Sequence, residues 1–145
     1  MNDKIKEILS KYKTIAMVGV SKDSTKTSTI VMKYMQKYGF KVIPVNPNAK
    51  GEKILGEEVF AKLEDIKTPV DIVDVFRPSV EAFRYAEETV KIDAKVLWLQ
   101  LGIRSSKAQE MLESKNIAYI ENRCTKMEYQ KIFLKINPAF PALQN

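Results

Sequence analysis

The sequence has 145 residues but contains no histidine and only one cysteine, and these two shortages exclude several kinds of chemistry. Without imidazole, the chain lacks the side chain that most often transfers protons near pH 7. Ser/His/Asp triads, Cys/His dyads and histidine-based zinc sites are therefore excluded. One cysteine cannot form a disulfide within the chain. The sequence offers no recognisable catalytic residues and no metal site, and it favours binding over turnover.

Long apolar runs are missing as well. No stretch approaches the roughly 20 apolar residues of a membrane-spanning helix, and no signal-peptide core follows Met1. The low cysteine content agrees with a reducing compartment. We therefore expect a cytoplasmic protein without a membrane partner.

Acidic residues are fewer than basic ones, at 18 Asp and Glu against 24 Lys and Arg, which gives a net charge of +6. Such a surplus favours an anionic partner. However, 20 of the basic residues are lysines spread along the whole chain, without a basic block or an RNA-binding aromatic motif. This distribution is typical of a solvated surface, so we expect no nucleic-acid partner.

Five short apolar runs recur along the chain, and each is followed by a polar break and a segment with helical spacing. The runs cover residues 14–20, 41–45, 71–76, 95–101 and 117–120. Their apolar residues are contiguous, as expected for strands covered on both faces. The alternation predicts an α/β fold, a Rossmann-like three-layer sandwich with a five-stranded parallel sheet. With right-handed crossovers we expect the strand order 3-2-1-4-5, and a ligand crevice at the carboxyl ends between strands one and four.

The intervening segments predict helices. Their residues are about 4–11, 30–38, 59–66 and 79–92. Capping boxes that begin at Ser106 and at Thr125 predict the starts of two further helices. No repeat or linker interrupts the series, so we expect a single domain over residues 1–137 and a proline-bearing tail over residues 138–145.

The first strand leads into the segment Gly19-Val20-Ser21-Lys22-Asp23-Ser24, where dinucleotide-binding folds carry a glycine-rich fingerprint. Only the first glycine is present. The helix start around Thr27 and Ser28 offers unpaired N–H groups and a positive dipole end to a phosphate. We therefore predict phosphate binding here, with an ordinary turn as the alternative. A P-loop is excluded because its second glycine and the Lys-Ser/Thr pair are missing.

The end of the second strand bears on the kind of nucleotide. An NAD-binding fold places Asp or Glu there to hold the ribose diol, but this chain has Val45-Asn46-Pro47-Asn48. The nearby charges are Lys41, Lys50 and Lys53. This pattern favours a phosphorylated ribose, as in NADP or coenzyme A, although the three lysines can equally be ordinary surface residues.

Five blocks of the sequence stand in the order and spacing of a known family. The blocks are IAMVGVSKD, VMKYMQKYGFKVIPVNPNAKGEKILGEEVF, PVDIVDVFR, AKVLWLQLGI and NRCTKMEY. From residue 12 to about 133 the chain resembles the small single-domain CoA-binding proteins, which are similar to the N-terminal CoA-binding domain of the succinyl-CoA synthetase α subunit. The resemblance implies that the protein binds coenzyme A, free or acylated. We expect it to act as a carrier or reservoir, or as a redox-linked sensor if Cys124 reacts with the CoA thiol as described below. It does not imply ligase chemistry, because the synthetase's phosphohistidine has no counterpart here.

The resemblance also implies a set of CoA contacts. The turn after the first strand and Ser28 would hold the diphosphate, Lys41 would approach the phosphorylated ribose, and the residues after the fourth strand would line the pantetheine. The full set is Gly19, Val20, Ser21, Lys22, Ser28, Lys41, Asn46, Pro47, Phe76, Arg77, Leu99, Gln100, Leu101 and Gly102. In this set Asn46 and Pro47 would flank the adenosine, and Phe76 and Arg77 would meet adenine and phosphate.

The lone cysteine, Cys124, has two interpretations. It follows Arg123 and directly precedes the expected helix start at Thr125, and both neighbours would lower the pKa of the thiol. Under this hypothesis Cys124 forms a mixed disulfide with the CoA thiol under oxidation. The alternative is a small buried residue that packs well.

Two other functions stay open at this point. One is an NADP- or CoA-dependent enzyme in which Lys22 or Arg77 stabilises developing charge, and the other is an interaction module that has lost its ligand. We interpret Asp71 and Asp74 as structural acceptors rather than general bases, because no second acid stands at a recognisable spacing. An unidentified protein partner, and a monomer or weak homodimer, agree with the sequence.

Overall fold

The computed structural model describes residues 1–138, so the predicted tail at 138–145 lies almost entirely outside the described residues. Five parallel strands form the main sheet. They are β1 (Thr14–Val18), β2 (Lys41–Val45), β5 (Ile72–Val75), β6 (Val96–Leu99) and β7 (Ala118–Ile120). These strands coincide with the five apolar runs, which confirms the predicted parallel α/β sheet.

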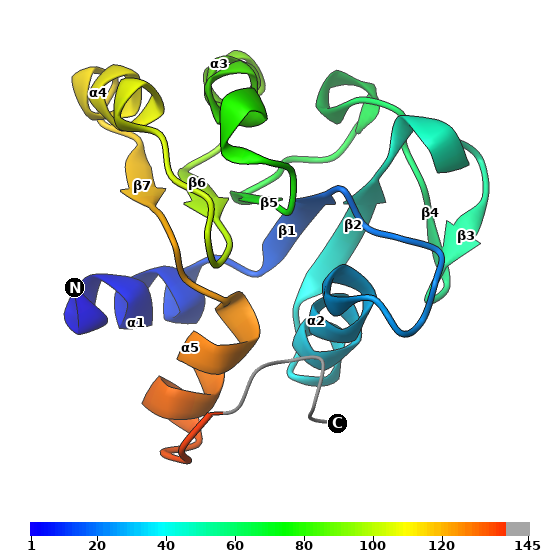
Figure 1. Ribbon diagram of the computed structural model, residues 1–145, viewed down its shortest axis with the longest axis horizontal. Coiled ribbons are helices and arrows are strands. Elements are labelled where there is room, and N and C mark those ends of the chain that lie inside the picture. The colour runs from blue at the N-terminus through cyan, green and yellow to red at the C-terminus, as the bar shows by residue number, and fades with distance from the viewer. Residues whose placement is uncertain (139–145) are drawn as a thin grey trace.

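Helices cover both faces of this sheet (Figure 1). One face carries α1 (Asn2–Lys11), α2 (Thr27–Lys37) and α5 (Thr125–Phe133), and the other carries α3 (Ala82–Lys91) and α4 (Ser106–Ser114). Two apolar cores result. Met17 and Trp98 belong to the core under the first set of helices, whereas Ala16 and Leu97 belong to the core under α3 and α4. The three-layer sandwich is therefore confirmed. No helix within residues 1–138 is long and apolar enough to cross a membrane.

The order of the strands differs from the predicted one. The sheet runs β2-β1-β5-β6-β7, which is 2-1-3-4-5 in the numbering of the five runs, so the predicted order 3-2-1-4-5 is wrong. The reason lies at the outer edge of β2. There the Phe60 N–H donates to Pro44 O at 3.0 Å, and the Asn46 N–H donates to Phe60 O at 2.9 Å. The segment around Phe60 thus occupies the edge where a third strand would pair, and the switch point moves to the gap between β1 and β5.

The chain between β2 and β5 contains no α-helix. Its elements are η1 (Pro47–Ala49), β3 (Lys53–Ile54), β4 (Glu57–Glu58) and η2 (Leu63–Asp65). The predicted helix over residues 59–66 is therefore wrong, because Phe60 forms a parallel bridge with Val45 and only one 3₁₀ turn follows. The helix predicted from residue 79 begins as the 3₁₀ turn η3 (Ser79–Glu81) and continues as α3.

The two capping boxes correctly predict where α4 and α5 begin, but they do not identify the residues at the N-cap positions. Helix α4 is capped by Ser105, whose Oγ accepts a hydrogen bond from the Ala108 N–H at 3.1 Å. Helix α5 has Cys124 at its N-cap position and no side-chain cap among the described residues. The hydroxyl of Thr125 is fully buried and binds inside the protein instead, and its partners there are described with the site.

Candidate functional site

Gly19 directly follows β1, where the carboxyl ends of β1, β2 and β5 meet. Its φ of +90° lies in the region that favours glycine, and its N–H donates to Val45 O at the end of β2 at 2.9 Å. A methyl group added at Gly19 would lie 3.0 Å from Cδ of Arg77, which follows β5. The backbone conformation favours glycine here, and any side chain at this position would have to displace Arg77.

The loop after Gly19 is fixed by hydrogen bonds from its neighbours. The Ser21 N–H donates to Ser28 Oγ at 3.1 Å, and Thr29 Oγ1 donates to Ser21 O at 2.6 Å. Asn46 Nδ2 donates to Val20 O at 2.9 Å, and Asn46 Oδ1 accepts from Asn48. Ser28 and Asn46 therefore shape the loop, and the side chain of Val20 is buried in the core.

The amino end of α2 is open to an anion. Among the described residues no side chain caps it, and its first turn contains no acidic residue. The nearest carboxylate, Asp23, accepts hydrogen bonds from the Thr25 N–H at 2.9 Å and from Thr25 Oγ1 at 2.7 Å, and these bonds hold the pKa of Asp23 below its usual value. The first-turn N–H groups, with Lys26 at the N-cap, are therefore available to a phosphate.

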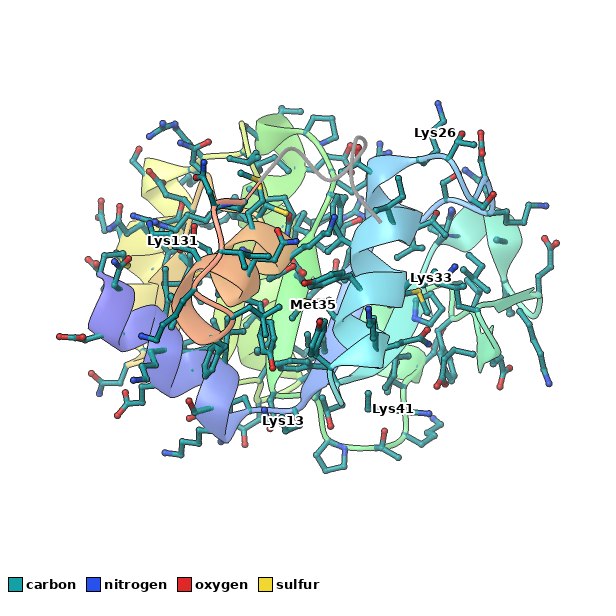
Figure 2. All side chains as sticks on the ribbon, turned by 90° about the horizontal axis from the view of Figure 1, so that it is seen from below. Lys13, Lys26, Lys33, Met35, Lys41 and Lys131 are labelled. Carbon is teal, nitrogen blue, oxygen red and sulfur yellow. The ribbon has the colours of Figure 1, made fainter. Side chains whose placement is uncertain are left out.

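Lys41 is not part of this crevice. It is the first residue of β2, opposite Thr14, so it lies at the amino edge of the sheet. Val45 lies four positions further along the strand, a distance of about 13 Å. Lys41 Nζ pairs with Glu57 at 2.7 Å. Figure 2 shows Lys26 and Lys41 toward opposite ends of α2. The expectation that Lys41 approaches the ligand is therefore wrong.

Lys50, in contrast, lies at the carboxyl edge of the sheet, where the crevice is. It directly follows η1 after the carboxyl end of β2 and is exposed, and it has no ion-pair partner among the residues that the structure describes. Lys22, in the loop after β1, pairs with Glu52 at 3.1 Å and so joins that loop to the segment of Lys50. Its position after Val45-Asn46-Pro47 is the sequence signal that distinguishes Lys50 from Lys41.

Phe76 and Arg77 lie beside the loop, as predicted, although they do so because β5 pairs with β1. The Phe76 N–H donates to Val18 O at 2.9 Å. The guanidinium of Arg77 binds Glu81 at 2.8 Å, and this pairing raises the pKa of Arg77 and lowers that of Glu81. The Arg77 side chain is 46% exposed, so it can still reach a ligand.

A groove that the sequence does not predict begins beside Pro47. It measures about 430 Å³ and runs between η2 and α3. Val45, Leu63 and Tyr85 contribute to its apolar lining. The groove cannot be expected from the sequence, because the helix predicted over residues 59–66 would cover the same edge of the sheet.

The residues after β6 divide into buried and exposed ones. Leu99 is 0% exposed and Gln100 is 4% exposed, so their side chains do not face the crevice. Leu101 is 42% exposed, and Gly102 lies beside it with its N–H bound to Asn122 Oδ1 at 2.7 Å. Of the four residues expected to line a pantetheine, only Leu101 and Gly102 are available at the surface.

Gln100 joins a closed set of buried polar groups beneath the crevice. Its Nε2 donates to Asp74 Oδ1 at 2.7 Å and to Thr125 Oγ1 at 3.1 Å. Burial raises the pKa of Asp74 to about 7, and the two hydrogen bonds oppose this rise. At the amino edge, Asp71 Oδ2 accepts from the Lys13 and Thr14 N–H groups, each at 3.3 Å. Both carboxylates serve as structural acceptors.

Cys124 is buried, with 2% of its surface exposed. Burial raises the pKa of its thiol to about 11, more than the N–H groups at the start of α5 lower it. Arg123 turns to Glu128, at 3.4 Å. The expectation of a reactive thiol with a low pKa is therefore wrong, and the interpretation as a packed residue fits the structure.

Comparison with known proteins places these features in a family. Residues 13–130 match the family described as CoA binding domain. The uncharacterized protein YneT of Bacillus subtilis (strain 168) is 41% identical over 125 residues, which make up 86% of this chain and 91% of YneT. The structure of cell-free ID.343 from Thermus thermophilus superimposes with a TM-score of 0.87 at 36% identity, covering 92% of this chain and 99% of that one.

A larger enzyme shares part of the sequence. The ADP-forming acetate–CoA ligase of Methanocaldococcus jannaschii is 26% identical over 87 residues, which are 60% of this chain but 12% of the ligase. The shared segment is therefore a small part of that protein.

Proposed function

Because the chain belongs to the family of CoA-binding domains, we propose that it binds coenzyme A, free or acylated, at the carboxyl edge of β1, β2 and β5, and acts as a carrier or reservoir. The observation that carries this proposal is the open amino end of α2. It stands next to the glycine turn at the switch point of the sheet, where ligands of open α/β folds bind.

The diphosphate of CoA fits the loop after β1. The first-turn N–H groups of α2 offer hydrogen bonds and a partial positive charge, and Lys26 adds a full charge at the same point. Lys22 lies in this loop and Arg77 beside it, although each is held by a carboxylate, Glu52 and Glu81 respectively. Ser28 supports the loop from below through Ser21 rather than serving mainly as a ligand contact.

The adenosine end fits the region of Asn46, Pro47 and Lys50. The groove beside Pro47 offers apolar walls to the adenine, and exposed Lys50 is the cation at this edge for the 3′-phosphate. Phe76 and Arg77 border the same crevice. A bare ribose diol has no carboxylate partner after β2, since Asn46 stands there and holds the Val20 carbonyl.

Isothermal titration calorimetry with CoA, dephospho-CoA, NADPH and ATP tests the proposal. The fluorescence of Trp98 would report ligand binding poorly, because Trp98 is fully buried and its indole N–H donates to Arg123 O at 2.7 Å. We expect saturable binding of one CoA per chain and weaker binding of the other three compounds. Binding of NADPH without CoA would overturn the proposal, and binding of none of the four would favour an interaction module.

A further inference from the structure

A second, polar pocket opens at the carboxyl end of β7, the edge strand farthest from β2. It measures about 300 Å³. The loop after β6, the first turn of α4, the segment after β7 and Met1, just before α1, contribute its walls. Its lining includes Arg104, Gln109, Tyr119, Glu121, Asn122 and Arg123. None of these residues belongs to the nucleotide site proposed above.

Positive charge exceeds negative charge among these side chains. Two guanidinium groups line the pocket against one carboxylate, Glu121. That carboxylate is already engaged, because the Tyr119 hydroxyl donates to it at 2.7 Å and Arg104 lies 3.3 Å from it. Arg123 has one long contact, 3.4 Å to Glu128. Since a guanidinium has five N–H donors, both arginines keep donors for a ligand.

The amide of Asn122 adds to this set. Its Oδ1 accepts from the Gly102 N–H at 2.7 Å, so its oxygen is bound and its NH₂ group remains as a donor. The same contact ties the pocket to the exposed Leu101–Gly102 turn. The Leu101–Gly102 turn therefore lies beside a pocket rich in hydrogen-bond donors.

The spacing of the strands places this pocket at the reach of the CoA thiol. From β1 to β7 the sheet crosses β5 and β6, and three strand spacings measure about 14 Å. An extended pantetheine arm has about 12 bonds between its phosphate oxygen and its sulfur, the length of about four residues or about 14 Å. If the arm runs along the carboxyl edge of the sheet from a phosphate at the α2 terminus, it is long enough for the sulfur to reach the end of β7.

We propose that this pocket receives the acyl group of a bound acyl-CoA and favours acyl groups that end in a carboxylate. The inference rests on the proposed CoA binding. An acyl group ending in a carboxylate accepts charge-assisted hydrogen bonds from Arg104 and Arg123. An acyl group ending in a methyl would desolvate the same donors without giving them an acceptor, which is costly.

Calorimetry with a matched pair of thioesters tests the inference. The acyl chain of butyryl-CoA ends in a methyl group at the position where that of succinyl-CoA ends in a carboxylate. We expect succinyl-CoA to bind about tenfold more tightly than butyryl-CoA, as one added charge-assisted hydrogen bond gives. Free CoA serves as the reference. Equal affinities for the two thioesters, with CoA still bound, would overturn this inference and leave the proposed function standing. Failure of CoA and both thioesters to bind would overturn both.

Two variants assign the preference to the pocket. Arg104→Gln and Arg123→Gln each remove one guanidinium, and each should reduce the preference for succinyl-CoA about fivefold or more while leaving the affinity for free CoA unchanged. Lys115→Gln is the control, because it removes one exposed positive charge just after α4, outside the pocket. A preference that survives both arginine variants, or that falls equally in the control, would overturn the assignment. Arg104 is 63% exposed, so its variant remains informative if Arg123→Gln does not fold.

Discussion

Thr125 Oγ1 donates a hydrogen bond to Asp74 Oδ2 at 3.2 Å, which links the first residue of α5 to the third residue of β5. Gln100 donates to both groups and closes a triangle that is cut off from water. A buried, hydrogen-bonded polar set of this kind fixes the position of the elements that carry it. Here it fixes the start of α5 beneath the crevice that we assign to CoA.

The buried carboxyl of Asp74 makes stability depend on pH. Its pKa rises from an ordinary value of 3.8 to about 7 in the folded protein, so the folded state holds its proton more tightly than the unfolded state. The free energy of unfolding contributed by this group is therefore present below pH 3.8 and is lost as the pH rises through about 7. Between these values the loss is at most about 1.4 kcal/mol per pH unit.

Urea denaturation of wild type and Asp74→Asn at about pH 5 and about pH 8 measures this effect. The variant cannot ionise at this position, so its stability should change less between the two conditions than that of the wild type. Asp3→Asn, at an exposed carboxylate in α1, controls for the loss of one titratable group. An unchanged pH dependence in Asp74→Asn would contradict the raised pKa.

Lys50 and Lys41 form a pair of variants that separates the two edges of the sheet. Lys50→Glu should weaken CoA about tenfold or more and dephospho-CoA much less, because only CoA carries the 3′-phosphate. Lys41→Glu should leave both affinities within about twofold, since Lys41 lies at the amino edge. Calorimetry with both ligands gives, for each variant, the ratio of its affinity to that of the wild type. A larger effect of Lys41→Glu on CoA than of Lys50→Glu would reverse the assignment.

Local composition predicts well where the strands lie in the sequence, but not which strands pair with each other. Five contiguous apolar runs identify the strands because burial on both faces leaves a direct trace in the sequence. The strand order depends instead on Phe60, which pairs with Pro44 and Asn46 through backbone groups and carries no distinctive pattern. With Phe60 at the outer edge of β2, β5 pairs with β1 on the other side, and this pairing places Arg77 beside Gly19.

The candidate site is likewise predictable where its residues directly follow a strand, but not where a distant partner sets the direction of a side chain. The loop after β1 and the segment Asn46-Pro47 follow strands directly, so their place at the carboxyl edge can be read from chain order. Gln100 also follows a strand, yet its side chain turns inward to Asp74. Burial of this kind depends on a partner 26 residues away, which no local pattern encodes. The role that the family resemblance implies for Lys41 is wrong because the first and last residues of a strand lie at opposite edges of the sheet.

Gly19 and Gly39 offer a second matched pair. Both have a φ near +90°, but a methyl group at Gly19 would lie 3.0 Å from Arg77 Cδ, whereas at Gly39 it would meet nothing within 4 Å. Each Gly→Ala variant should lose about 1–2 kcal/mol of stability through backbone strain. Only Gly19→Ala should also weaken CoA, by about tenfold, because Arg77 and the loop must move apart. Thermal unfolding and calorimetry measure the two effects. An equal loss of CoA affinity in Gly39→Ala would show that strain, and not the contact, is responsible.

Cys124 should be unreactive in the folded protein. Its thiol is 2% exposed, and burial raises its pKa to about 11, so both access and the thiolate fraction are low near neutral pH. Alkylation by iodoacetamide at about pH 7.5, followed by intact mass, should be at least about a hundredfold slower than for an unfolded chain, where the thiol titrates near its ordinary pKa of about 8.5. The same reaction in denaturant should be complete, and Cys124→Ser should give no adduct under either condition. Rapid native labelling, or an adduct with oxidised CoA that dithiothreitol reverses, would contradict the buried assignment, since thiol exchange requires an accessible thiolate.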